Sequence, residues 1–388
     1  MFDVEVTVIG GGIVGCAAAA ACAGAGRSTV LLEMEAGVAR ATTSRNSEVA
    51  HGGMYYPTGS LKARFCVEGR RLLKEFCTAA GVGYREFGKI IVAVEPAEIP
   101  ALERLLALGQ ANGVEDLRLI DGRELADLEP QVKGVAGLLS PRTAVLDAEG
   151  AAKAYARLAA EHGAQIMPGT RVTGLERKNG AWQVDILPTG DKRREGWRHA
   201  SRFVINAAGL WADKVAALAG IDIRDRGWQL HLSKGNYFGV DSAHQGKVSR
   251  LIYPVPPALG TSLGVHVCLD LAGRMKLGPD IQAPDADPRD VNRDPDAFAL
   301  DYSVDPGRGD AFFEDARRFL PWLRREDLTP DMCGLRPKLV TAGFGDFVVQ
   351  REEAAYDGLI NLVGIESPGL TCAPALARHV AGLINEAD

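Results

Sequence analysis

Three glycines near the start of the chain have the spacing of a nucleotide-binding turn. Gly10, Gly12 and Gly15 follow a β-forming run at 4–9 and open an alanine-rich stretch typical of a helix. Such a turn lets the backbone approach a pyrophosphate at the positively polarised N-terminus of the helix. Glu33 ends the next predicted strand and can accept hydrogen bonds from adenosine ribose hydroxyls. The pattern predicts an adenine dinucleotide, and the Glu33 carboxylate disfavours NADP; a glycine turn without a ligand is the alternative.

A second glycine loop, at 364–371, joins a predicted strand to a predicted C-terminal helix. Thr371 could cap this helix, with Pro374 in its first turn. Free N–H groups at a helix N-terminus favour negative charge, so they would stabilise the anionic pyrimidine ring of a reduced flavin. An ordinary capped helix has the same pattern, and the choice between NAD and FAD stays open at this point.

The elements that position the first turn form a βαβ unit. Strands at 4–9 and 28–32 flank the first helix, as in a parallel sheet. Further helices are predicted at 60–80, 101–112, 148–163, 309–319 and 371–385. Further strands are predicted at 84–94, 165–168, 172–177, 182–187, 203–208, 228–240, 251–255, 263–269, 275–278, 332–339, 346–350 and 359–363. The strands from 228 to 278 indicate a second domain of antiparallel strands.

Two segments between these elements are predicted to be loops. The segment 191–202 contains five Lys/Arg, and its composition fits a solvated hairpin loop better than a basic patch. The segment 280–310 is rich in Asp and Pro. It does not match an EF-hand, because Pro288 interrupts the acidic residues and no glycine stands at the sharp-turn position. We therefore expect a connecting loop and no metal ion.

Length and charge limit the classes of function. At 388 residues the chain exceeds the ~250–300 residues at which single cores stop growing, so we expect two domains. The 44 Lys+Arg and 50 Asp+Glu give a formal charge of −6, which argues against non-specific nucleic-acid binding and favours a small-molecule partner. Seven cysteines without a CxxC pair predict reduced thiols in a cytoplasmic protein. The uncharged run 6–26 contains six glycines and follows acidic residues, so no membrane segment or export signal is expected.

Short motifs in a fixed order connect these features to a known family. After the first turn and Glu33 they are Ser-Arg-Asn-Ser at 44–47, His-Gly-Gly-Met-Tyr-Tyr at 51–56, Gly-Ser-Leu-Lys-Ala at 59–63, Gly-Lys-Ile-Ile-Val-Ala at 88–93, Asn-Ala-Ala-Gly at 206–209, Leu-Ile-Tyr-Pro-Val-Pro at 251–256, Gly-Val-His at 264–266 and Ser-Pro-Gly at 367–369. In this order the chain resembles the L-2-hydroxyglutarate oxidases and dehydrogenases, FAD enzymes of the D-amino-acid oxidase (glycine oxidase-like) superfamily. The resemblance covers nearly the whole chain. It implies an α/β fold, with a Rossmann-like FAD-binding domain and an α+β substrate domain built on a mixed, largely antiparallel sheet.

The resemblance also implies which residues contact FAD. They are Gly10, Gly12, Gly15, Glu33, Ser44, Asn46, Ser47, Val172, Ala208, Gly209, Gly364, Ser367, Pro368, Gly369, Leu370 and Thr371. Val172 matches a position whose backbone meets the adenine, and 367–371 matches the loop at the flavin edge. In this superfamily the arginine of a Gly-Leu-Arg-Pro segment binds the substrate carboxylate, which implies that role for Arg336.

The chain departs from the commoner hydroxyglutarate pattern on two predicted strands. Lys-Gly-Asn-Tyr-Phe at 234–238 replaces an Arg-Gly-Glu-Tyr-Tyr segment, and Pro337 and Lys338 follow Arg336 where smaller, less basic residues are expected. The resemblance places these strands at the pocket. The departures therefore leave the class of reaction intact and the far end of the substrate open.

Oxidation of a 2-hydroxy acid moves a hydride to the flavin and needs a base for the hydroxyl proton. Imidazole accepts a proton near neutral pH, and His51 and His266 both lie in the family-like motifs. Either histidine could be this base. Each could instead be structural, and His51 could hydrogen-bond the flavin.

The same motifs supply candidates for substrate binding. Arg336 would hold the α-carboxylate through two parallel hydrogen bonds, and a surface ion pair is its alternative. Lys62 and Lys338 are candidates for a second carboxylate, unless solvent surrounds them. Tyr253 and Tyr237 could donate hydrogen bonds to substrate or simply pack.

The sequence thus predicts FAD-dependent oxidation of a 2-hydroxy acid similar to L-2-hydroxyglutarate. An amino-acid or amine oxidase on the same scaffold is the first alternative, and a flavin-binding module without turnover is the second. The electron acceptor is either oxygen or a quinone, and a quinone would bring the protein to a membrane surface. We expect the FAD-binding domain at 1–83, 147–224 and 351–388, and the substrate domain at 84–146 and 225–350.

Overall fold

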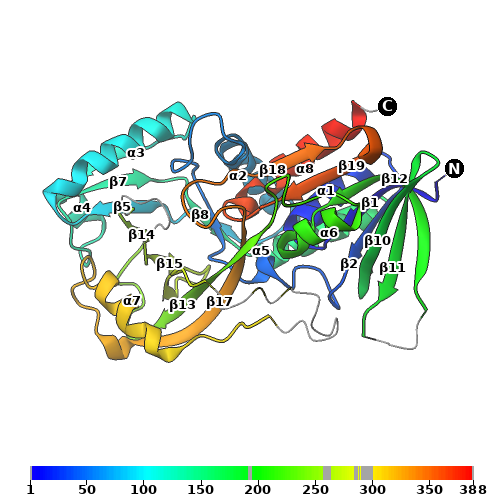
Figure 1. Cartoon of the computed structure of the whole chain (residues 1–388). Helices are drawn as coiled ribbons and strands as arrows, with labels where there is room; N and C mark the ends of the chain where they lie inside the picture. The colour runs from blue at the N-terminus through cyan, green and yellow to red at the C-terminus, as the bar shows by residue number, and fades with distance from the viewer. Residues whose placement is uncertain are drawn as a thin grey trace.

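A computed structural model of the chain describes residues 2–190, 195–256, 264–283, 287, 289 and 300–386. Two eight-stranded sheets and a small three-stranded sheet form the fold (Figure 1). The helices are α1 Ile13–Gly24, α2 Leu61–Ala80, α3 Ile99–Ala111, α4 Gly122–Leu128, α5 Ala148–Glu161, α6 Ala212–Leu218, α7 Gly309–Ala316 and α8 Gly369–Asn385. The strands are β1 Val4–Ile9, β2 Thr29–Glu33, β3 Val49–Ala50, β4 Tyr84–Arg85, β5 Lys89–Ala93, β6 Arg118–Asp121, β7 Ala136–Ser140, β8 Ala144–Leu146, β9 Gln165–Pro168, β10 Thr170–Lys178, β11 Ala181–Pro188, β12 Trp197–Asn206, β13 His231–Val240, β14 Leu251–Pro254, β15 Val267–Leu269, β16 Met275–Leu277, β17 Leu328–Lys338, β18 Val348–Arg351 and β19 Leu359–Val363.

The first large sheet has a parallel core. Strands β19, β12, β1, β2 and β9 run parallel, and the antiparallel strands β10, β11 and β18 extend the sheet. Both faces of its core are buried, which explains the nearly continuous apolar runs of its strands. Val6 and Val8 pack toward α1, α5 and α8, whereas Ile9 and Val204 pack toward α6. This arrangement confirms the Rossmann-like fold that the family resemblance implied.

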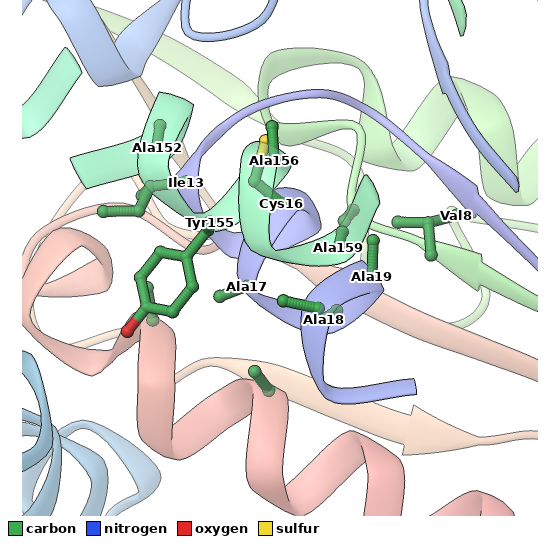
Figure 2. Packing of buried hydrophobic residues seen from close by; sticks show 14 of the residues in the cluster. Val8, Ile13, Cys16, Ala17, Ala18, Ala19, Ala152, Tyr155, Ala156 and Ala159 are labelled. Carbon is green, nitrogen blue, oxygen red and sulfur yellow. The ribbon is translucent and has the colours of Figure 1, made fainter. Parts of the chain in front are cut away.

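Alanines bring α1 close to α5, as Figure 2 shows. The buried alanines 17–20 of α1 share one cluster with Ala152 and Ala156 of α5. Small side chains allow two helices to approach each other closely, and both helices pack on the same face of the sheet. Beside it, the ring of Tyr155 stacks on Phe76 of α2 with centroids 3.6 Å apart. The packing holds the start of α1, and therefore the glycine turn, in a fixed position.

The second large sheet is mixed. Its order is β17-β13-β16-β15-β14-β5-β7-β6, and all neighbours are antiparallel except β14 and β5. Helix α3 packs on the face that carries Ile91, and α7 packs on the face that carries Ile90. The parallel pairing of β14 with β5 confirms the mixed sheet that the family resemblance implied, whereas the strands predicted from 228 to 278 indicated only antiparallel pairing. The exception arises because β5 and β14 come from distant segments of the chain, so no hairpin dictates their relative direction.

Several boundaries differ from the sequence predictions. The strand predicted at 203–208 begins earlier, at Trp197, because residues 197–201 pair with β11. The second half of the loop expected at 191–202 is therefore part of a strand. Residues 191–194 lie outside the described residues. In the connecting loop expected at 280–310, residues 284–286, 288 and 290–299 also lie outside them. The short elements β6, α4 and β7 occupy a stretch for which no element was predicted.

The strands of each large sheet come from separate chain segments. The first sheet uses 4–33, 165–206 and 348–363, and the second uses 89–140 and 231–338. The two domains expected from the sequence stay a prediction, and β18 extends across the expected boundary at 350. All seven cysteines are buried and none forms a disulfide. In the described part of the chain, no helix has the length and apolar character needed to cross a bilayer.

Candidate functional site

A cavity of about 1120 Å³ is lined by both large sheets. Its walls come from β1, β2 and β10 of the first sheet, from β13 and β17 of the second, and from the loops after β3 and β19. Most residues predicted from the sequence meet there. Those that line it are Gly10, Gly12, Glu33, Asn46, Ser47, His51, Lys62, Val172, Ala208, Gly209, Tyr237, Tyr253, His266, Arg336, Lys338, Ser367, Pro368, Gly369 and Leu370.

The glycine turn forms one end of this cavity. Gly10 has a φ of +110°, and a Cβ there would lie 2.4 Å from the carbonyl oxygen of Ala207. Gly12 is the N-cap of α1 and offers no side-chain cap. Thr43 compensates in part, because its Oγ1 accepts a hydrogen bond from the N–H of Ile13 at 3.0 Å. The turn presents bare backbone to the cavity at a helix N-terminus, which suits a pyrophosphate.

Glu33 stands beside this turn at the end of β2. Its Oε2 accepts a hydrogen bond from the N–H of Gly11 at 2.5 Å, and its Oε1 accepts one from Glu35 at 2.7 Å. Burial raises the pKa of Glu33, and these two backbone donors oppose the rise. Val172 lines the same cavity from β10. A backbone cradle that a Cβ would fill, next to a carboxylate at a strand end, fits the diphosphate and ribose of FAD.

Two asparagines hold the loops that follow. The side-chain amide of Asn46 donates to the carbonyls of Thr42 at 2.9 Å and Thr43 at 2.7 Å. The amide of Asn206 donates to the carbonyl of Ala212 at 2.8 Å. These bonds fix the two loops that bring Ser47, Ala208 and Gly209 to the cavity.

Four predicted cofactor residues lie behind the wall instead of lining it. Gly15 backs directly onto the turn, Ser44 donates to a carbonyl of its own loop at 3.2 Å, and Gly364 packs under the side chain of Leu339. Thr371 is the fourth. These four residues contact other protein groups, and they therefore help to shape the wall of the cavity without lining it.

Helix α8 begins at Gly369, and this corrects the sequence prediction that Thr371 is its N-cap. Pro374 consequently lies in the second turn and not in the first. A threonine ahead of an apolar run is a typical cap, but here the neighbouring strand uses its hydroxyl. Thr371 Oγ1 accepts from the N–H of His51 at 3.0 Å and donates to the carbonyl of Val49 at 3.3 Å. The start of α8 therefore has no side-chain cap and faces the cavity through 367–370.

Two neutral imidazoles also line the cavity. His266 Nδ1 lies 2.8 Å from the carbonyl oxygen of Gly264, which can only accept, so Nδ1 carries the proton and Nε2 carries the lone pair. The His266 ring stacks on Tyr253 with centroids 3.6 Å apart. Burial lowers the pKa of His266 to about 3. Burial also lowers the pKa of His51 well below its ordinary value, with smaller contributions from Lys89 and His266.

Arg336 lines the cavity from β17. Its Nη2 donates to the carbonyl of Asp280 at 3.1 Å, and its Nη1 lies 3.5 Å from Ser233 Oγ. Among the described residues, no carboxylate forms an ion pair with it. Gly235 on the neighbouring strand leaves room for the guanidinium, because a Cβ there would lie 2.2 Å from Arg336 Nη2. A guanidinium with unused N–H groups at a cavity suits a carboxylate ligand.

Lys62 and Lys338 share one carboxylate that the sequence analysis did not single out. Lys62 Nζ lies 3.0 Å from Glu366 Oε1, and Lys338 Nζ lies 3.4 Å from Glu366 Oε2. All three residues line the cavity, and their charges sum to +1. Tyr237 also lines it, and its hydroxyl donates to Ser47 at 3.3 Å.

The structure corrects the expectation that the whole departing segment at 234–238 faces the pocket. Lys234 pairs with Asp301 at 2.7 Å, and Asn236 binds Asp280 through its backbone and side-chain N–H groups. Gly235 and Tyr237 are the residues of this segment that line the cavity. Strand alternation explains the difference, because neighbouring residues of β13 point to opposite faces.

Three comparisons place this geometry among known proteins. A family model described as FAD dependent oxidoreductase (DAO) matches residues 5–383. The mitochondrial L-2-hydroxyglutarate dehydrogenase of Arabidopsis thaliana is 36% identical over 97% of this chain and 83% of its own length. That of Mus musculus is also 36% identical, over 70% of this chain, which spans less than two thirds (59%) of the mouse protein. The FAD-bound L-α-glycerophosphate oxidase of Mycoplasma pneumoniae has a TM-score of 0.84 and 26% identity, covering 98% of this chain and 94% of its own.

Proposed function

Because the chain belongs to the DAO family of FAD-dependent oxidoreductases, we propose that it oxidises a 2-hydroxy acid of the L-2-hydroxyglutarate type to the 2-oxo acid. One observation carries this proposal: Arg336, His51 and His266 line one cavity. A 2-hydroxy acid needs a group that binds its carboxylate and a group that takes its hydroxyl proton, and these residues provide both.

Arg336 orients the substrate. The N–H groups that Asp280 and Ser233 leave unused can hold the α-carboxylate through two parallel hydrogen bonds. Fixing the carboxylate fixes the position of C2 and of its hydroxyl relative to the loop at 367–370, which reduces the entropy lost on reaching the transition state. FAD, when bound, supplies the acceptor for the hydride that leaves C2.

We assign the role of the base to His266. Its Nδ1 proton is held by Gly264, so Nε2 is free to take the hydroxyl proton as the hydride leaves. Stacking on Tyr253 holds the plane of the ring. No hydrogen bond among the described residues fixes the tautomer of His51, whose Nδ1 is buried without a partner. We therefore assign His51 to hydrogen bonding with flavin or substrate.

The trio of Lys62, Lys338 and Glu366 is the candidate for the far carboxylate. Glu366 neutralises one lysine charge, and the second remains for a carboxylate at the distal end of the substrate. This assignment makes a dicarboxylate a better substrate than a monocarboxylate. It also explains how two lysines remain largely buried beside the cavity, since each has an anionic partner.

Anaerobic flavin reduction tests the proposal. Oxygen-free protein is mixed with L-2-hydroxyglutarate, L-lactate or L-glutamate, and the visible flavin absorbance is followed. We expect rapid bleaching with L-2-hydroxyglutarate, slower bleaching with L-lactate, which lacks the far carboxylate, and none with L-glutamate, which carries an amine in place of the hydroxyl. His266→Ala should slow the reduction by about 10²–10⁴-fold, the usual contribution of a general base.

Bleaching by L-glutamate alone would replace the proposal with an amino-acid oxidase. If dithionite reduces the flavin but none of these substrates does, the result would favour a flavin-binding module without turnover. The same sample identifies the electron acceptor, for which we propose oxygen or a quinone. If oxygen is the acceptor, admission of air restores the flavin absorbance. If a quinone is the acceptor, a soluble quinone restores it in the absence of air.

A further inference from the structure

Lys89 is a fully buried cation whose ammonium has no hydrogen-bond partner among the described residues. It is the first residue of β5, and the apolar residues 90–93 that follow it are buried on both faces of the strand. Strand alternation therefore does not bring it to solvent. Burial of an unpaired charge is unfavourable, and an ionisable group kept in such a place beside a cavity is a candidate for a functional role.

Two tyrosine rings separate Lys89 from the cavity. Its Nζ lies 4.6 Å from the ring centroid of Tyr55 and 4.6 Å from that of Tyr253. Both tyrosines line the cavity, and both hydroxyls are buried without a partner. His266 stacks on Tyr253, so the ammonium lies one ring away from the base proposed above. Cation–π contacts of this kind hold an ammonium in place without neutralising it.

We propose that Lys89 is a positioning residue of this site, whose ammonium acts through Tyr55 and Tyr253 to attract the carboxylates of the substrate. Low polarity around the group strengthens its field, since the two rings and not water lie between it and the cavity. The inference rests on the proposed function in so far as it takes the ligand to be an anion. When Lys89 loses its proton, it no longer carries the positive charge that attracts the anion.

The other groups that face Lys89 come from several elements. They are Tyr55 and His51 before α2, Cys66 of α2, Tyr253 of β14, His266 and Cys268 around β15, Ser140 of β7, and Arg336 of β17 beyond His266. Burial raises the pKa of both tyrosines and of Cys268, and it lowers the pKa of both histidines. The two tyrosines, Cys268 and the two histidines are consequently neutral at pH 7, whereas Arg336 carries a fixed positive charge.

Burial lowers the pKa of Lys89 itself to about 7. Because the pKa of a lysine is lowered, the ammonium is charged below about pH 7 and neutral above it. Anion binding favours the charged form, so by linkage it must raise the affinity of Lys89 for its proton. Binding of an anion near pH 7 should then take up a fraction of a proton from the solution.

Calorimetric titration of the FAD-loaded protein with oxalate tests this directly. Oxalate is a dianion from pH 6 to pH 8 and has no hydroxyl to oxidise, so the result does not depend on turnover. Titrations in buffers of different ionisation enthalpy count the protons taken up. We expect about tenfold tighter binding at pH 6 than at pH 8, with proton uptake at pH 7, and we expect Lys89→Met to lose both.

Lys276→Met is the matched control. Lys276 lies on β16 of the same sheet, with its Nζ 5.3 Å from the ring of Tyr237, but it contributes to the pKa of neither histidine. This variant should keep the pH dependence and the proton uptake of the unchanged protein.

Absence of proton uptake by the unchanged protein at pH 7 overturns the inference, and so does uptake that survives in Lys89→Met. If Lys89→Met does not retain FAD, Lys89→Gln is used in its place. The proton uptake of the unchanged protein tests the inference without either variant. Proton uptake with oxalate together with flavin that L-2-hydroxyglutarate does not reduce would refute the proposed substrate and support the role of Lys89. In a protein that does turn over, KM for the hydroxy acid should rise about tenfold from pH 6 to pH 8 and kcat should change less.

Discussion

Arg336 owes its free guanidinium edge to its neighbours. A backbone carbonyl and a hydroxyl take part of its hydrogen-bonding capacity, and no described carboxylate competes for the rest. Its fork geometry can match a carboxylate with two parallel bonds, which a lysine ammonium cannot do. The arginine therefore contributes direction as well as charge.

We expect Arg336→Lys to lower kcat/KM for L-2-hydroxyglutarate by about a hundredfold, because the charge stays but the orientation of C2 is lost. Steady-state kinetics together with the visible flavin spectrum check this, and the spectrum should stay unchanged. Arg274→Lys is the control, since Arg274 is an exposed arginine whose partner is Asp270. Equal activity of Arg336→Lys and the unchanged protein would remove Arg336 from the site.

His266 also links the stability of the fold to pH. Its folded pKa of about 3 lies below the pKa of about 6.5 that the unfolded chain has. The unfolded state binds the extra proton, so this stability is complete above pH 6.5 and is lost as the pH falls toward 3. We expect the unchanged protein to lose up to about 1.4 kcal/mol per pH unit more than His266→Phe, which keeps the stack on Tyr253. Urea unfolding between pH 7 and pH 4.5 measures the difference, and parallel curves would contradict the burial of a neutral imidazole.

At the scale of elements, the pairing of β13 with β17 decides where the substrate arginine lies. Ser233 is opposite Arg336 and Gly235 is opposite Gly334, so the guanidinium passes over a position without a side chain. A Cβ at Gly235 would meet Arg336 Nη2 at 2.2 Å and the ring of Pro279 at 2.9 Å. The strand pair is therefore shaped for this side chain.

Gly235→Ala should displace the guanidinium and raise KM by about tenfold or more, with FAD binding unchanged, because the glycine turn lies on the other sheet. Gly239→Ala lies on the same strand, and the nearest atom to its Cβ would be Thr329 Oγ1 at 3.7 Å, so we expect it to behave as the unchanged protein. Comparison of KM and of the flavin-to-protein absorbance ratio in the two variants is the measurement. A rise in KM for both variants would point to a general loss of strand order.

At the scale of the whole molecule, the cavity is the place where the two large sheets meet. Residues of β1, β2 and β10 line it from one side and residues of β13 and β17 from the other. A ligand that occupies it contacts both sheets at once. Cofactor binding should consequently stabilise the whole chain and not only the nucleotide-binding half.

We expect removal of FAD to lower Tm by several degrees and to make Tm depend on added FAD. A ligand that binds only the folded state contributes about 4 kcal/mol when its free concentration is 1,000 times Kd. Thermal unfolding of the apoprotein across a series of FAD concentrations measures this. A Tm that does not change with FAD would mean that the cofactor does not hold the two sheets together.

The sequence by itself determined the local features of this protein. The spacing of Gly10, Gly12 and Gly15 and the acidic end of the next strand identified the nucleotide-binding turn, because both depend on neighbouring residues along one βαβ unit. The ordered motifs also indicated the family and the class of reaction, which the comparisons confirm. The roles of the individual site residues stay predictions that the experiments above address.

Only the tertiary structure decided which side chains act on one another across the chain. Lys89 occupies a strand position that sequence patterns cannot distinguish from an exposed one, and its place behind Tyr55 and Tyr253 depends on the parallel pairing of β5 with β14. Glu366 likewise meets Lys62 through a contact between residues 304 positions apart. Such contacts are set by how sheets and helices pack, and no local pattern of residues encodes them.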